Sequence, residues 1–178
     1  SSEISGYYEN FYISHDGSLV AFTGDPTEFF IWDRKNDEII NSGDFDSDIW
    51  NLQFLNEKDR LIINRKDTDE EYLIYTVFDV NSGSIENTYK IPADPSVISN
   101  IKYIPNLSPS VDLSGNDSRL FYSYSAFIDG YFKTVSLALN PENGNYTLYG
   151  PLSGNFTKLC ISPNGRYSAL SFSYKSNH

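Results

Sequence analysis

Two stretches of the chain repeat one pattern at a separation of 148 residues. The first reads Gly6-Tyr-Tyr-Glu-Asn-Phe-Tyr-Ile-Ser-His-Asp-Gly17, and the second reads Gly154-Asn-Phe-Thr-Lys-Leu-Cys-Ile-Ser-Pro-Asn-Gly165. Each is followed by a short run of small and apolar residues, which ends in Ala21-Phe22 or in Ala169-Leu170. Internal repetition of this kind indicates an architecture of similar units, each of which buries its apolar face against a neighbour.

The segments between the two copies favour β-structure. Ile31-Trp32-Asp33 and Val77-Phe78-Asp79 occupy matching positions, and short apolar runs alternate with turn clusters such as His15-Asp16-Gly17 and Asn81-Ser82-Gly83. No long segment keeps an apolar period of about 3.6 residues, which a helix would require. We therefore predict an all-β chain whose repeated unit is a four-stranded antiparallel blade of a β-propeller.

The repeats predict one partial propeller over residues 1–178 with about three and a half blades. The blades are expected at about 10–45, 48–92 and 97–152, with a half blade at 156–174. The expected strands are Phe11–Ser14, Leu19–Thr23, Glu28–Trp32 and Glu38–Ser42; Ile49–Leu55, Leu61–Arg65, Tyr72–Val80 and Ile85–Ile91; Val97–Ile104, Arg119–Ala126, Tyr131–Leu139 and Tyr146–Gly150; and Phe156–Ile161 and Arg166–Ser173. The segment Pro105–Asn116 is expected to be an insertion in the third blade.

Apolar patterning predicts which side chains are covered. Leu19–Phe22 and Phe29–Trp32 are apolar at successive positions, so both faces of these strands should be buried. In the outer strand, Ile85, Asn87, Tyr89 and Ile91 should face one way and the intervening residues the other. The residues expected in the core are Ile31, Trp32, Phe54, Val77, Phe78 and Ile161. Truncation of a buried Trp32 to alanine should cost ~3–5 kcal/mol.

The repeats resemble those of the WD40 β-propeller family. The resemblance is carried by Trp32-Asp33 at the end of a third strand, by Phe78-Asp79 in the same position, by Gly43 before an acidic loop, and by the two Ser-x-Asp/Asn-Gly turns. The Gly-His pair usual before the first strand is replaced by Gly43-Asp44 and Gly154-Asn155. The resemblance implies a propeller that binds other proteins. Because the Gly-His pair is missing, the family's His–Asp network is not assumed for this chain.

A propeller needs roughly 4–8 blades to close its ring. Three and a half blades would leave sheet edges and apolar faces exposed, and such edges favour pairing with another chain. We expect the remaining blades to come from further sequence of a larger protein. The alternative is another subunit, as in a dimer of half-propellers that completes a seven-bladed ring.

Charge and composition exclude several classes of partner. The chain has 13 basic and 24 acidic residues, for a formal net charge of −11, which disfavours direct binding of nucleic acid. The single cysteine, Cys160, permits neither an internal disulfide nor a multi-cysteine metal site, and fits an intracellular location, cytoplasmic or nuclear. No apolar run approaches the ~18 residues of a membrane span, so no membrane insertion is expected.

The sequence lacks the local signatures of common enzymes, so we expect no catalytic residues and no cofactor. His15 lies between Ser14 and Asp16, where we interpret it as an exposed turn residue rather than part of a catalytic triad. Two acidic clusters have the alternation of a calcium loop but lack its later glycine and glutamate, so we interpret both as solvated loops. These clusters are Asp44, Asp46 and Asp48, and Asp112, Ser114 and Asn116.

Acidic loops are the best candidates for contact with partner proteins. The candidate residues are Asp44, Asp46, Asp48, Trp50, Asp67, Asp69, Glu70 and Glu71. The carboxylates would attract a basic peptide, and tryptophan is frequent at binding hot spots. The leading hypothesis is thus a non-catalytic scaffold that presents its loops and rim to other proteins or peptides.

Two alternative functions stay open from the sequence. The propeller could be the accessory or gating domain of a peptidase-type hydrolase whose catalytic domain lies outside this sequence, or it could bind glycans. Further sequence would discriminate, because a Gly-x-Ser-x-Gly stretch would favour the hydrolase and more blades the scaffold.

Overall fold

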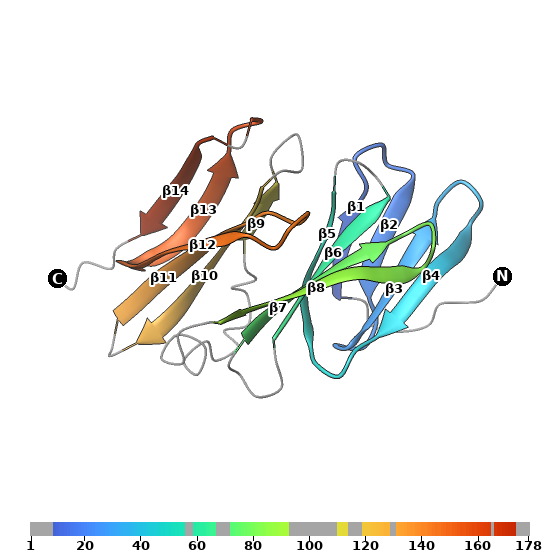
Figure 1. Cartoon of the computed structure of the whole chain (residues 1–178), viewed down its shortest axis with the longest axis horizontal. Helices are drawn as coiled ribbons and strands as arrows, with labels where there is room; N and C mark the ends of the chain where they lie inside the picture. The colour runs from blue at the N-terminus through green and yellow to red at the C-terminus, as the bar shows by residue number, and fades with distance from the viewer. Residues whose placement is uncertain are drawn as a thin grey trace. The chain divides into compact units, whose positions relative to one another are not determined.

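The computed structural model describes residues 9–55, 59–66, 72–92, 110–113, 119–128, 131–164 and 166–173. All regular secondary structure in these ranges is β-strand. The strands form three four-stranded antiparallel sheets and one antiparallel pair, and within each sheet the strands follow chain order (Figure 1). The all-β class and the four-stranded antiparallel sheets predicted from the sequence are confirmed.

The first sheet contains β1 (Glu9–Ile13), β2 (Leu19–Thr23), β3 (Glu28–Asp33) and β4 (Glu38–Asp44). The second contains β5 (Ile49–Phe54), β6 (Arg60–Lys66), β7 (Tyr72–Asp79) and β8 (Ser84–Pro92). The third contains β9 (Ser110–Leu113), β10 (Leu120–Ile128), β11 (Tyr131–Leu139) and β12 (Tyr146–Ser153). The two-stranded sheet contains β13 (Asn155–Ile161) and β14 (Ser168–Ser173).

The chain divides into two compact units, Ser1–Ile91 and Pro92–His178. The first unit holds the first two sheets, and the second unit holds the third sheet and the β13–β14 pair. One continuous partial propeller over residues 1–178 stays a prediction.

The first strand of the third sheet is not where the sequence placed it. The expected strand Val97–Ile104 lies outside the described residues, and the strand that pairs with β10 is β9, which falls within the expected insertion Pro105–Asn116. The pairing runs from Ser110 opposite Ser123 to Leu113 opposite Leu120. Four residues flanked by proline, serine and glycine carry too short an alternation to indicate a strand, and only the presence of β10 makes them one.

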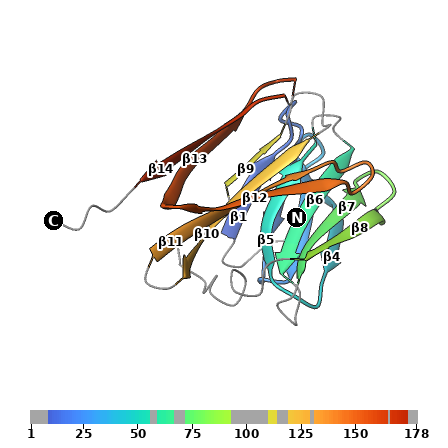
Figure 2. The same ribbon diagram turned by 60° about the vertical axis from the view of Figure 1, so that its left-hand side comes forward.

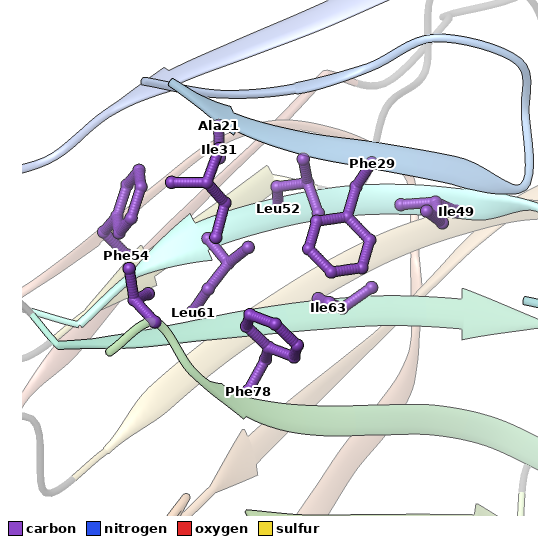
Figure 3. Packing of buried hydrophobic residues seen from close by; sticks show 10 residues of the cluster. Ala21, Phe29, Ile31, Ile49, Leu52, Phe54, Leu61, Ile63 and Phe78 are labelled. Carbon is purple, nitrogen blue, oxygen red and sulfur yellow. The ribbon is translucent and has the colours of Figure 1, made fainter. Parts of the chain in front are cut away.

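A dense core joins the two sheets of the first unit (Figure 3). Ala21, Phe29 and Ile31 of the first sheet face an apolar surface of the second sheet. That surface consists of Ile49, Leu52, Phe54, Leu61, Ile63, Phe78 and Val80. Figure 3 shows Phe29 reaching toward Phe78, and the two rings meet edge to face with centroids 5.1 Å apart.

Gly43 is required for this packing. A Cβ atom on Gly43 would lie 2.5 Å from Cε1 of Phe29, far inside normal contact distance. Gly43 is paired with Phe29 across β3 and β4, so the absence of a side chain makes room for the ring. The glycine that precedes the acidic loop thus serves the core rather than a turn.

The burial predictions are confirmed for four of six residues. Ile31, Phe54, Val77 and Phe78 are buried, whereas Trp32 and Ile161 are half-buried. Trp32 points away from the second sheet because it follows Ile31, which points toward it. The loss of ~3–5 kcal/mol in the free energy of unfolding expected for Trp32→Ala is therefore too large. In β8, Ile91 is buried, whereas Ile85, which the alternation places on the same face, has an exposed fraction of 53%. That face is therefore covered near Ile91 and exposed near Ile85.

The two copies of the sequence repeat form the same turn. The hydroxyl of Ser14 donates to Asp16 Oδ1 over 2.8 Å, and that of Ser162 donates to Asn164 Oδ1 over 2.8 Å. Each serine hydroxyl also accepts the backbone N–H five residues later, at 2.9 and 3.0 Å. The repeat therefore encodes a hydrogen-bonded turn, and Asp and Asn are interchangeable there because each offers a side-chain oxygen.

A second turn recurs at the end of the third strand of each four-stranded sheet. It begins at Asp33, Asp79 and Asn140, and the residues four positions later are Asp37, Gly83 and Gly144. The latter three adopt positive φ values of 56°, 67° and 71°. The side-chain oxygen of each first residue accepts a hydrogen bond from the turn backbone. The Asp of the Trp-Asp and Phe-Asp pairs is therefore a turn cap.

In the second unit, the third sheet packs on the β13–β14 pair. Phe121 and Ala138 meet Leu159, with Ile161 and Leu170 packed against them. Lys158, Cys160 and Ala169 of the pair are exposed. Because neighbouring residues of a strand point to opposite faces, one face of the pair meets the third sheet and the other carries the exposed residues.

We predict that Phe29→Ala lowers the free energy of unfolding by ~3–5 kcal/mol, because the ring is 1% exposed and fills the centre of the core. Trp32→Ala in the same strand should cost clearly less, since Trp32 is half-buried on the opposite face. Urea denaturation of the two variants tests this difference. Equal losses would contradict the assignment of the two faces.

We further predict that Ser82→Ala raises the pKa of Asp79 toward its ordinary value. Hydrogen bonds from the backbone N–H and then the side chain of Ser82 lower the pKa of Asp79 in the folded protein. A lowered pKa contributes stability above the ordinary aspartate pKa, and this stability is lost as pH falls through the lowered value. Carboxyl NMR titration should show a partial rise, because the backbone N–H remains.

Asp33 is the internal control for this titration, since its pKa is lowered mainly by the backbone N–H of Asn36, a contact that the variant leaves intact. A shift of both aspartates, or of neither, would contradict the capping role of Ser82.

Candidate interaction surface

The loop between β4 and β5 is the acidic segment that the sequence selected for partner binding. Its backbone is tied to the turn between β2 and β3, since the N–H of Phe45 donates to the carbonyl of Thr27 over 3.1 Å and the N–H of Ile49 donates to that of Pro26 over 2.6 Å. The ring of Phe45 stacks on Phe29, with centroids 5.9 Å apart. The loop is therefore anchored on the core.

Arg65, near the end of β6, contacts the loop through Asp46, Ser47 and Phe45. Its side chain is 8% exposed, and its Nη1 donates to Asp46 Oδ1 over 3.0 Å and to Ser47 Oγ over 3.3 Å. The guanidinium carbon also lies 3.9 Å from the ring centroid of Phe45, a cation–π contact. A buried guanidinium needs charged and polar partners to offset its loss of hydration, so Asp46 serves this arginine.

The structure brings four of the eight candidate residues together. Asp44, Asp46 and Asp48 are exposed and Trp50 is half-buried, all in or beside this loop. Asp46 pairs with Arg65. The other two carboxylates of the loop, Asp44 and Asp48, form no ion pair within the described part of the chain. Asp67, Asp69, Glu70 and Glu71 lie outside the described residues.

Trp50 owes its partial exposure to an irregularity in β5. Ile49 pairs with Arg65 and Asn51 pairs with Asn64, so Trp50 is the extra residue of a bulge. A bulge re-aims the side chain of the inserted residue. The strand pattern alone did not indicate this.

The sequence analysis missed the polar side chains next to the bulge, those of Tyr12, Asn51 and Asn64. Burial raises the pKa of the Tyr12 hydroxyl, and hydrogen bonds from the backbone N–H of Leu52 and the side chain of Asn51 oppose that rise. Asn51 and its cross-strand partner Asn64 are 5% and 2% exposed. An asparagine within a strand is rare enough to serve as a signal, and two at paired positions would be a stronger one.

The residues considered in the sequence for a catalytic or calcium site have structural roles or lie outside the described residues. Ser14 and Asp16 bond each other within the first repeat turn, and His15 between them is exposed. No cluster of three or more His, Cys, Asp or Glu side chains that could hold a metal ion occurs among the residues described. Ser114 and Asn116 are outside those residues. No helix in the described ranges is long and apolar enough to cross a membrane.

The first sheet has an apolar face directed away from the second sheet, which we call the open face. It carries Phe11, Ile13, Val20, Phe22, Phe30 and Trp32. Phe22 lies between Phe11 and Phe30, at centroid distances of 5.9 and 5.5 Å. Phe11 and Ile13 remain 61% and 62% exposed. Large apolar side chains exposed side by side mark a surface suited to association.

Comparison with known proteins defines the fold but no family. No protein-family model matches the chain, and no curated protein matches it. Solved structures do match, and they comprise 516 chains. One of them is Kuenenia stuttgartiensis hydrazine synthase, with a TM-score of 0.65 and 13% sequence identity.

The alignment with hydrazine synthase covers 90% of this chain and 48% of that chain. This chain therefore spans about half of its structural neighbour. At this level of identity the likeness shows a shared fold alone.

We predict that Phe11→Ser combined with Ile13→Ser lowers the binding of a hydrophobic dye to the folded protein, because these residues supply most of the exposed area of the open face. The free energy of unfolding should change by about 1 kcal/mol or less, as is usual for exposed positions. Phe22→Ser is the control, since its side chain is 5% exposed and its loss should destabilise the fold. Unchanged dye binding in the double variant would contradict the exposure of this face.

Proposed function

We propose that this chain forms part of a WD40-like β-propeller that acts as a non-catalytic scaffold for partner proteins. The proposal is supported by the repetition of one four-stranded antiparallel unit with the same turn after its third strand. It is also supported by the way successive sheets pack. In the first unit β1 lies beside β5, and in the second unit β13 lies beside β9, so that within each unit the later sheet places its first strand against the first strand of the earlier sheet.

The exposure of the open face supports the proposal that this chain forms only part of a propeller ring. The other face of the same sheet carries Ala21, Phe29 and Ile31 and is covered by the second sheet. The two faces are alike in apolar character, and a radially packed blade is covered on both. We propose that a further blade covers the open face, supplied by additional sequence of the same protein or by another subunit.

The observation that carries the proposed scaffold role is the anchored acidic loop. Arg65 holds the side chains of Asp46 and Ser47, and Phe29 stacks on Phe45, while Asp44, Asp48 and the half-buried Trp50 stay accessible. An ordered loop loses less conformational entropy on binding than a flexible one. The carboxylates and the indole together suit a basic peptide segment of a partner protein.

The test is binding of peptides rich in lysine and arginine to the whole chain. Asp44→Asn combined with Asp48→Asn should weaken binding by about three- to tenfold, because exposed ion pairs contribute ~0.2–1 kcal/mol each. High salt should weaken binding by the wild-type protein more than by the variant, since salt screens exposed charges. Isothermal titration calorimetry provides the measurement.

Glu38→Gln combined with Glu142→Gln is the matched control, because it also removes two exposed carboxylates, one at the start of β4 and one in the turn between β11 and β12. It should leave the affinity unchanged. Equal weakening by both variants would show that only net charge matters, and no binding by the wild-type chain would overturn the proposed role of the loop.

A further inference from the structure

Strand β8 presents an exposed edge. It is the last strand of the second sheet, whose order is β5-β6-β7-β8 (Figure 2). The side chains of residues 84–88 are all exposed, and the exposed fraction of Ile85 reaches 53%. The outward backbone N–H and C=O groups of such a strand can pair with a strand of another molecule.

The sequence of β8 is complementary to itself when run in the opposite direction. Ile85-Glu-Asn-Thr-Tyr-Lys-Ile91 is centred on Thr88. In an antiparallel pair of two copies with Thr88 opposite Thr88, each Glu86 lies opposite a Lys90, and each Ile85 lies opposite an Ile91. Opposite charges on directly facing residues stabilise a strand pair, and like charges destabilise it.

The charged side chains of β8 are placed to meet a partner strand. Thr88 Oγ1 lies 3.4 Å from Thr76 Oγ1, and the Lys90 ammonium lies 5.7 Å from the ring centroid of Tyr72, so Thr88 and Lys90 share one face of the sheet. Glu86 belongs to the same face because side chains alternate along a strand. Neither Glu86 nor Lys90 forms an ion pair within the described part of the chain.

The outer strands of the other two sheets do not have this property. In β4, antiparallel self-pairing would place Glu38 opposite Asp44, two acids in a chain with a formal net charge of −11. In β12, Gly150 has a φ of 110° and the register with β11 shifts between Thr134 and Ser136. Pro151 follows directly and lacks a backbone N–H. Among the last strands of the three four-stranded sheets in the described residues, only β8 is self-complementary in this way.

We infer that β8 is a self-association edge, at which two copies of this chain pair their β8 strands antiparallel about a two-fold axis through Thr88. The pairing joins two second sheets into one continuous sheet of eight strands. It is independent of the proposed scaffold role of the acidic loop and of the coverage of the open face.

A charge exchange tests the pairing. By symmetry, Glu86→Lys turns both Glu–Lys contacts into Lys–Lys contacts, and Lys90→Glu turns both into Glu–Glu contacts. In sedimentation velocity of the whole chain, each single variant should raise the dimer dissociation constant by about tenfold or more. The double variant restores opposite charges and should return it to within about threefold of the wild-type value. A double variant as weak as the singles, or a wild-type chain that stays monomeric at rising concentration, would overturn the inference.

Cysteine cross-linking locates the axis. In a background with the exposed Cys160 replaced by serine, Thr88→Cys places two thiols opposite each other, within the range of a disulfide bond. Ile85→Cys on the same exposed strand places them roughly 20 Å apart. Oxidation should link the Thr88→Cys chains and leave the Ile85→Cys chains monomeric. Linkage of both to the same extent, or of neither, would overturn the two-fold arrangement.

Association through the open face would respond differently. Phe11→Ser combined with Ile13→Ser leaves β8 intact, so the dimer and its response to charge exchange should persist in that background. Loss of the dimer there would assign association to the open face and overturn the role of β8.

Discussion

The packing of Phe29 between the two sheets of the first unit is the interaction on which the surrounding structure depends. The ring meets Phe78 of the second sheet edge to face and stacks with Phe45 of the β4–β5 loop. It fits only because Gly43 beside it has no side chain. One aromatic residue thus joins the first sheet to the second and positions the loop that connects them. Since Arg65 also contacts the ring of Phe45, the acidic loop is anchored on the core.

This dependence changes the interpretation of the acidic loop. A run of alternating aspartates suggests a set of equivalent charges. In the structure Asp46 forms an ion pair with the buried Arg65, whereas Asp44 and Asp48 are exposed and do not contact this arginine. Trp50 becomes accessible through a bulge, next to a buried pair of asparagines. The surface that we propose for a partner is therefore small and anchored on the core, and its charge is lower than the sequence suggests.

The open face and the β8 edge are the two further surfaces for which we propose association. The open face carries aromatic side chains, whereas the β8 edge carries opposite charges in a self-complementary order. Apolar faces associate with little directional preference, while a strand edge fixes direction and register through its backbone. The two surfaces thus suit different partners, an apolar sheet face in one case and a second copy of the chain in the other.

The sequence alone determined what depends on local interactions. The bounds of β2 and β11, Leu19–Thr23 and Tyr131–Leu139, follow from their apolar runs and flanking turns. The turns capped by Ser14 and Asp33 follow from side-chain oxygens that accept backbone N–H groups of the same turn, those of Leu19 and Lys35. The tertiary structure decided which of the alternating faces is covered, so that Ile31 is buried and Trp32 is only half-buried. It also decided that β9 is a strand and that Arg65 pairs with Asp46. These features depend on neighbours distant in the chain. A period of two residues in the sequence indicates that the two faces of a strand differ, but it does not indicate which face packs on another sheet.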